Sequence, residues 1–106
     1  MSHTDDAQQP DVGRVDRLVH EPARMGILTV LQRVRSVEFL FLQNALGLTK
    51  GNLSSHLAKL ENGGLVAITK TFVSKKPRTS VEITPQGREA IARHWQQLEQ
   101  LRNLGS

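Results

Sequence analysis

The stretch from residue 49 to residue 65 carries the side chains best suited to binding a partner. Leu53, Leu57 and Leu60 follow one another at helical spacing, which predicts a helix that buries these three on one face. The opposite face holds amides, hydroxyls, amines and a glycine, and nothing bulky or acidic. Such a face can lie in a groove of DNA and bond to base edges and phosphates. The candidate DNA-binding residues on this predicted helix are Thr49, Lys50, Gly51, Asn52, Ser54, Ser55, His56 and Lys59.

The residues that face the groove most directly are expected to read bases. Asn52 can bond adenine through both amide groups, Ser55 suits several base edges, and Lys59 can reach guanine or a phosphate. Lys50 can serve a base or a phosphate, and Gly51 keeps the surface flat. The alternative is an ordinary amphipathic helix whose polar face is simply solvated.

The remaining three residues of this group are expected to support binding without reading sequence. Thr49 is the predicted N-cap, and with Ser54 it lies near the margin of the face, where phosphate contacts position the protein. His56 lies between the buried and polar faces, so we expect it to pack or to bond a phosphate. Ser54, Ser55 and His56 form no catalytic arrangement, because adjacent helical residues point in different directions and no carboxylate is placed to orient the histidine.

Several elements must position this helix. A short helix is predicted over residues 15–19 and an apolar helix over 22–35, followed by a break at 36–38. Residues 39–46 form a compact helix, and a turn of three residues with Gly47 leads into the stretch described above. Two helices joined by so short a glycine turn are typical of a helix-turn-helix.

A hairpin is predicted directly after this helix. From residue 66 the apolar period changes from 3.6 to 2, and β-branched residues dominate two runs, at 66–72 and 80–84. Segment 73–79 joins them as a basic tip, which can lie along the DNA backbone or place an arginine in a narrow minor groove. The alternative is a charged tip that keeps the hairpin soluble. The candidate DNA-binding residues of this wing are Lys75, Lys76 and Arg78.

The last predicted helix carries an apolar row to the end of the chain. Thr84 is its N-cap, Pro85 suits its first turn, and it runs to about Asn103. The row can pack on its own domain, but it continues beyond what so small a domain can cover. We therefore predict a dimer interface, which in a two-fold dimer sets two recognition helices about 34 Å apart on a pseudo-palindromic DNA site. The row consists of Ile91, Trp95, Leu98 and Leu101.

Charge and composition favour a polyanionic partner. The chain of 106 residues has a net charge of +4, and residues 47–80 hold six lysine or arginine residues against one glutamate. Positive charge therefore gathers around the candidate helix and hairpin, which suits nucleic acid. There is no cysteine, so disulfides, thiolate metal sites and a cysteine nucleophile are excluded.

The chain is expected to hold one domain, at residues 15–104. Residues 1–14 are polar and read as a disordered or loosely attached tail, and residues 105–106 as a frayed end or cloning remnant. Neither a signal peptide nor an apolar run long enough to cross a membrane is present, so a soluble, cytoplasmic protein is expected.

The sequence resembles the small winged-helix transcriptional regulators of the ArsR/MarR type. The resemblance covers about residues 15–100 and implies an α+β, mostly α fold: a winged helix-turn-helix with a three-helix core, a two-stranded β wing and a C-terminal dimerisation helix. It also implies a homodimer made by terminal helices, which adds Leu18 to the expected interface. Metal-sensing members use sites that contain cysteine, which this chain lacks. The segments that carry the resemblance are 20–28, 46–61, 64–66, 76–79 and 83–88.

These observations predict a homodimeric, sequence-specific regulator that binds double-stranded DNA, with recognition helix 49–62 in the major groove and wing 73–79 on the flanking backbone or minor groove. The alternative from another class is a protein-interaction module of the same fold that docks an acidic partner. Nothing supports an enzyme, and no cofactor or metal is expected, although a metal site across a dimer stays open. No residue identifies an effector, an operator or the sign of regulation.

Overall fold

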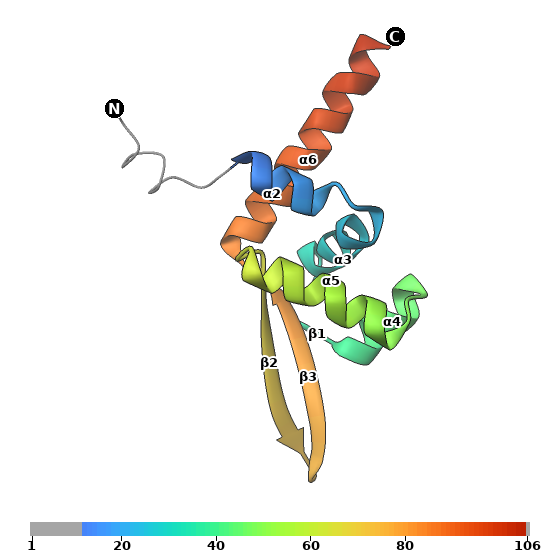
Figure 1. Cartoon of the computed structure of the whole chain (residues 1–106), viewed down its shortest axis with the longest axis vertical. Helices are drawn as coiled ribbons and strands as arrows, with labels where there is room; N and C mark the ends of the chain where they lie inside the picture. Colours follow the sequence, from blue (N-terminus) through green and yellow to red (C-terminus); the bar gives the residue numbers. More distant parts are fainter. Residues whose placement is uncertain (1–11, 106) are drawn as a thin grey trace, which may run out of the picture.

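The computed structural model describes residues 12–105, and this range folds into five helices and a small antiparallel sheet (Figure 1). The order of the elements confirms the predicted winged helix-turn-helix. In chain order they are α2 (Val12–Val19), α3 (Pro22–Gln32), β1 (Val37–Glu38), α4 (Phe39–Leu46), α5 (Lys50–Asn62), β2 (Val66–Val73), β3 (Lys76–Ile83) and α6 (Pro85–Leu104).

The first two helices differ in extent from the prediction. Helix α2 begins at Val12, so the last three residues of segment 1–14, expected as a loose tail, are helical; residues 1–11 lie outside the described range. Helix α3 ends at Gln32, three residues earlier than expected. Its start is well defined, because the Glu21 carboxylate accepts a hydrogen bond from the backbone N–H of Arg24 at 3.0 Å. An acidic side chain at this end also suits the helix dipole.

The turn between α4 and α5 follows from local chemistry. Gly47 ends α4 with a φ of 64°, a left-handed conformation that favours glycine. Thr49 then caps α5, since its hydroxyl accepts a hydrogen bond from the backbone N–H of Asn52 at 3.1 Å. Together these two residues stop one helix and start the next within three positions, as the sequence predicts.

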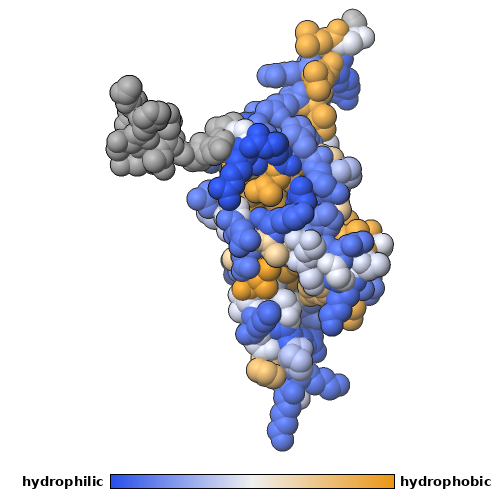
Figure 2. Space-filling model, viewed as in Figure 1, coloured by the Kyte–Doolittle hydropathy of each residue, from blue (hydrophilic) through white to orange (hydrophobic). Residues whose placement is uncertain are grey.

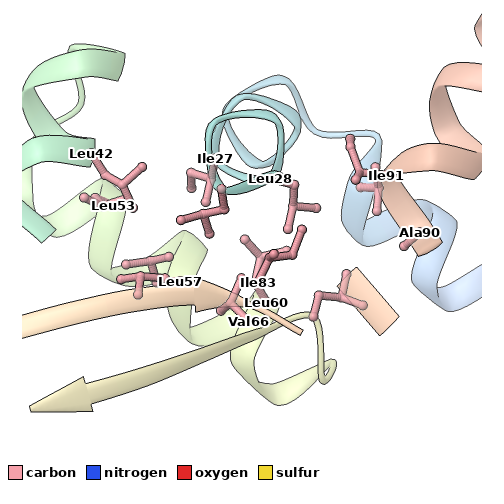
Figure 3. Close-up of a cluster of buried hydrophobic side chains, with 14 residues drawn as sticks. Ile27, Leu28, Leu42, Leu53, Leu57, Leu60, Val66, Ile83, Ala90 and Ile91 are labelled. Carbon is pink, nitrogen blue, oxygen red and sulfur yellow. The ribbon is translucent and has the colours of Figure 1, made fainter. Parts of the chain in front are cut away.

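A single apolar core joins all the helices to the sheet. Its centre is made by residues of α3 and α5 that are fully buried, with contributions from α4, the sheet and the first half of α6 (Figure 3). The predicted buried face of α5 is confirmed, since Leu53, Leu57 and Leu60 are at most 2% exposed. In α4, by contrast, Leu40 and Phe41 stay more than half exposed. Burial of this row fixes which face of α5 is turned toward solvent.

The wing is a long hairpin with one additional strand. Strands β2 and β3 pair from Val66 with Ile83 to Val73 with Lys76, so only two residues form the turn, and the loop is shorter than the predicted segment 73–79. Ser74 and Lys75 both have positive φ, of 53° and 68°, as the central residues of a two-residue type I′ hairpin turn do. Strand β1 lies on the other edge of β3, which makes a sheet of three strands where two were expected.

Helix α6 begins inside the core and ends outside it. The Thr84 hydroxyl caps it by accepting a hydrogen bond from the N–H of Gly87, as predicted, and Pro85 occupies its first turn. Its first half packs against the core, whereas its last turns extend away from the body of the molecule (Figure 1). The helix is thus longer than the surface available to cover it.

Candidate nucleic-acid interface

Helix α5 presents a continuous polar face to solvent, directly opposite its buried leucines. This face is exposed from one end of the helix to the other, and it includes Gly51, which has no side chain, and Ser55, whose side chain is small. Hydroxyl, amide and amine groups can therefore be offered to a groove without a steric barrier. The candidate residues found exposed are Thr49, Lys50, Gly51, Asn52, Ser54, Ser55 and Lys59.

His56 is the exception among the candidate residues. Its side chain is 18% exposed, and its Nδ1 lies 3.2 Å from a guanidinium nitrogen of Arg24 and 4.0 Å from a carboxylate oxygen of Glu21. The Nε of Arg24 also donates to the carbonyl of Leu18 at 2.6 Å. His56 therefore joins α5 to the start of α3 and the end of α2.

Glu21 is held in its charged form at this junction. Burial raises its pKa, but the backbone hydrogen bond from Arg24 and the nearby charge of His56 outweigh burial, and the pKa of Glu21 lies below its ordinary value. Nothing in its local pattern indicated a contact with a histidine 35 positions away.

A groove of about 700 Å³ separates α5 from the wing. Lys50 and Ser54 line it from the helix, and Lys70 and Thr79 face them from the strands. It contains one carboxylate, from Glu61. No local sequence pattern indicates Lys70 or Thr79 as part of this groove, because the groove depends on a hairpin folding back toward the helix. A strand of a nucleic-acid backbone can lie in a channel of this kind, with cations on both walls.

The basic residues of the wing are not equivalent. Lys75 occupies the turn, and Lys76 begins β3 beside it. Arg78 lies further from the tip and forms an ion pair with Glu38 of β1. Both partners of this pair are about half exposed, so the pair adds little stability, but it directs Arg78 toward the β1 edge of the sheet.

The structure also shows what these residues do not form. Ser54 lines the groove beside the wing, while His56 contacts Arg24 on the other side of α5, so the helix does not bring them together for catalysis. Among residues 12–105, no group of three or more His, Asp or Glu side chains is placed to hold a metal ion. No helix in the same range is long and apolar enough to cross a membrane.

The five residues predicted for a dimer interface divide into two groups. Ile91 is fully buried in the chain's own core, so it cannot present a surface to a second copy, and the prediction for this residue must be corrected. Leu18 is half-buried and packs against the core. Trp95, Leu98 and Leu101 are exposed, by 45%, 39% and 63%. The exposed row on α6 therefore starts one turn later than predicted, and it extends to Leu104, which is 83% exposed.

Solved structures share this fold. A homodimeric winged helix-turn-helix DNA-binding domain from Mycobacterium bovis, a possible ArsR-family regulator, superposes with a TM-score of 0.70 at 22% identity, over 97% of this chain and 88% of that chain. The regulator NadR, solved with 4-hydroxyphenylacetate, superposes with a TM-score of 0.61 at 18% identity, over 92% of this chain and 74% of that chain.

Closer relatives are found in archaea. A transcriptional regulator homologue from Pyrococcus horikoshii is 38% identical, with a TM-score of 0.77 over 82% of this chain and 86% of that chain. An uncharacterized protein of Methanocaldococcus jannaschii is 34% identical over 85 residues, which cover 80% of this chain and 92% of the relative. Residues 23–102 match the family described as winged helix DNA-binding domain. The chain belongs to this family of winged-helix DNA-binding proteins.

Proposed function

We propose that this protein is a homodimeric, sequence-specific transcriptional regulator that reads double-stranded DNA with α5. The observation that carries the proposal is the exposed face of α5, which is polar along its length and held rigidly by a fully buried row of leucines. A rigid helix loses little conformational freedom when it enters a major groove, and its side chains then meet base edges in a fixed register.

Within this proposal, the residues of α5 divide the work of binding. Asn52, Ser55 and Lys59 are exposed and carry the groups that bond base edges. Lys50 and Ser54 line the groove toward the wing, where a phosphate backbone would pass. His56 acts indirectly, by fixing α5 against Arg24.

The wing supplies contacts that are independent of sequence. Lys75 and Lys76 are exposed at the end of the hairpin, and Lys70 faces α5 across the groove. Amines are suited to phosphates, since they act as compact charges that do not depend on the base. Arg78 is the weaker candidate, because it must first leave Glu38.

The exposed apolar row of α6 supports a dimer. Trp95, Leu98 and Leu101 lie on consecutive turns, and an exposed apolar surface of this kind is typical of a protein interface. The domain from Mycobacterium bovis with the same fold is a homodimer. A two-fold dimer would set two copies of α5 on successive turns of the duplex, and the preferred site would then be pseudo-palindromic.

Salt dependence of binding tests the electrostatic part of this proposal. Affinity for a selected duplex should fall by orders of magnitude between about 50 and 200 mM salt, because each neutralised phosphate releases counterions. Fluorescence anisotropy of a labelled duplex measures this directly. An affinity that stays flat over the range would contradict phosphate contacts by α5 and the wing, and would favour an acidic protein as the partner of the basic face.

A further inference from the structure

The outer end of the wing carries an exposed aromatic residue. Phe72, near the end of β2, is 77% exposed, which is more than Phe41 on α4 or Trp95 on α6. Figure 2 shows the outer half of the hairpin as mostly hydrophilic, with a small hydrophobic patch on it. The chain's own core does not use the Phe72 side chain, so packing within the domain does not account for a phenylalanine here.

Phe72 lies directly opposite Pro77 in the register of the two long strands. Because proline lacks a backbone N–H, it suits a pair that exchanges no hydrogen bonds, and in such pairs the facing side chains are closest. Only one further pair of residues separates Phe72 and Pro77 from the two-residue turn. These two residues therefore form a compact apolar pair at a short, well-defined end of the hairpin.

The apolar pair lies on the face of the wing that is turned toward α5. Side chains of a strand alternate between its two faces. Lys70 comes two residues before Phe72 and lines the groove beside α5, and Thr79 comes two residues after Pro77 and lines the same groove. The pair therefore continues this row toward the tip of the wing. Arg78 lies on the opposite face, where it meets its ion-pair partner on β1.

The length of the strands places the apolar pair beyond the groove. Two residues of a strand span about 7 Å, so Phe72 lies about that far past Lys70. In the proposed function, the backbone of one DNA strand passes through the groove, and α5 occupies the major groove on one side of it. The minor groove is on the other side of that backbone, so the apolar pair would lie over the minor groove. Lys70 would then contact phosphates of the near strand, and Lys75, in the turn, those of the far strand.

We propose that Phe72, supported by Pro77, is an apolar wedge that enters the minor groove beside each half-site and bends the duplex there. Apolar side chains that enter a minor groove part a base step and kink the DNA toward the major groove. The amines on either side of the pair neutralise phosphates of both strands and hold the tip in place. This inference rests on the proposed function, and it adds a contact that reads how easily the DNA deforms.

The wedge predicts a sequence preference at positions that α5 does not reach. Pyrimidine–purine steps such as TA and CA unstack easily, whereas A-tracts are stiff. The parent chain should therefore bind a duplex with a TA step beside the half-site about fivefold more tightly than one with an A-tract there. Phe72→Ala should bind the two duplexes equally.

Anisotropy titrations of a selected duplex test the wedge directly. Phe72→Ala should weaken binding about tenfold, because it removes the apolar surface that the minor groove buries. The salt dependence of its affinity should stay that of the parent chain, since no charge is lost, whereas Lys76→Ala should reduce the slope by about one. Energy transfer between dyes at the two ends of the duplex should report a smaller bend with Phe72→Ala. Phe72→Leu, which keeps an apolar side chain, should retain most of the affinity and the bend.

Phe41→Ala is the matched control. It makes the same change at a side chain that is 55% exposed on α4 and does not line the groove beside the wing. Its affinity for DNA should stay within about twofold of the parent chain, and neither Phe41→Ala nor Phe72→Ala should alter unfolding in urea by more than about 0.5 kcal/mol.

Three results would overturn the wedge. Equal affinity and an equal bend for Phe72→Ala and the parent chain would do so and would leave the proposed function standing. A loss of self-association in Phe72→Ala, measured by sedimentation, would instead assign Phe72 to a contact between copies of the chain. A parent chain that binds no duplex would contradict both the proposed function and the wedge.

Discussion

Helices α5 and α6 both carry an apolar row at helical spacing, but the two rows are buried to different extents. In α5, Leu53, Leu57 and Leu60 are all buried, and the opposite face is left polar and exposed. In α6, Ile91 is buried, whereas Trp95 and Leu101 are 45% and 63% exposed. The chain's own core covers the whole apolar row of α5 but only part of the apolar row of α6.

The difference follows from the length of each helix relative to the small core that covers it. A helix of 13 residues fits across the core, so its apolar row is covered and its polar face is left exposed to solvent. A helix of 20 residues is about 30 Å long, and the core covers only its first half. The uncovered half keeps the same pattern of residues, and a second copy can bury it.

The largest expected effect is the difference between the two rows in their contribution to the free energy of unfolding. Leu57→Ala should lower the free energy of unfolding by about 2–5 kcal/mol, because it leaves a cavity under α5. Leu101→Ala removes an exposed side chain and should change the unfolding of the monomer by no more than about 0.5 kcal/mol. Urea titration followed by circular dichroism measures both, at a protein concentration low enough for the chain to be monomeric. Similar losses in the two variants would mean that the end of α6 packs on its own chain.

For self-association, the exposed row of α6 should matter more than the buried row of α5. Leu101→Lys places a charge in the exposed row and should convert the proposed dimer to a monomer at micromolar concentration, because a lone charge is costly to bury in an interface. Leu40→Lys is the matched control, since Leu40 on α4 is 60% exposed but lies outside this row. It should leave the dimer intact. Sedimentation equilibrium gives the mass, and a monomeric parent chain would remove both the interface and the pseudo-palindrome.

A smaller effect concerns the point where α6 leaves the core. His94 is 3% exposed, and neither ring nitrogen has a hydrogen-bond partner among residues 12–105. Its ring packs edge-on against that of His20, with the ring centroids 4.8 Å apart. Burial and the charge of His20 lower its pKa, while Asp16 acts in the opposite sense. The unfolded chain therefore binds a proton at a higher pH than the folded chain does.

The lowered pKa of His94 therefore makes a pH-dependent contribution to the free energy of unfolding. This contribution to the free energy of unfolding is fully present above the unfolded pKa of about 6.5, and is lost as pH falls toward the lowered folded pKa. His94→Leu should flatten that slope, and His20→Gln, at an exposed position, should retain most of it. Urea titrations at a series of pH values test this. An unchanged slope in His94→Leu would contradict a buried, neutral His94.

Local chemistry made much of the fold predictable. Thr49, Gly47 and Pro85 act within a few residues of themselves, so the limits of α4 and α5 and the start of α6 could be inferred from the sequence. Strand β1 has only two residues and exists because it pairs with β3, more than 40 positions later, so no local pattern identifies it.

The candidate nucleic-acid interface could be predicted from the sequence to about the same extent as the fold. The polar face of α5 follows from its period, whereas the contact between Arg24 and His56 joins residues 32 positions apart. The boundary between Ile91 and Trp95 also required the structure, because an apolar row does not reveal where the core that covers it ends.

Selection of bound duplexes from random DNA is the most direct measurement of the central claim. We expect an enriched pseudo-palindrome with half-sites about 10 base pairs apart. Asn52→Ala should relax preference at its own position by about 1–3 kcal/mol, whereas Lys76→Ala should retain the same site with weaker binding throughout. No enriched sequence, or a preference altered by Lys76→Ala and not by Asn52→Ala, would contradict recognition by α5.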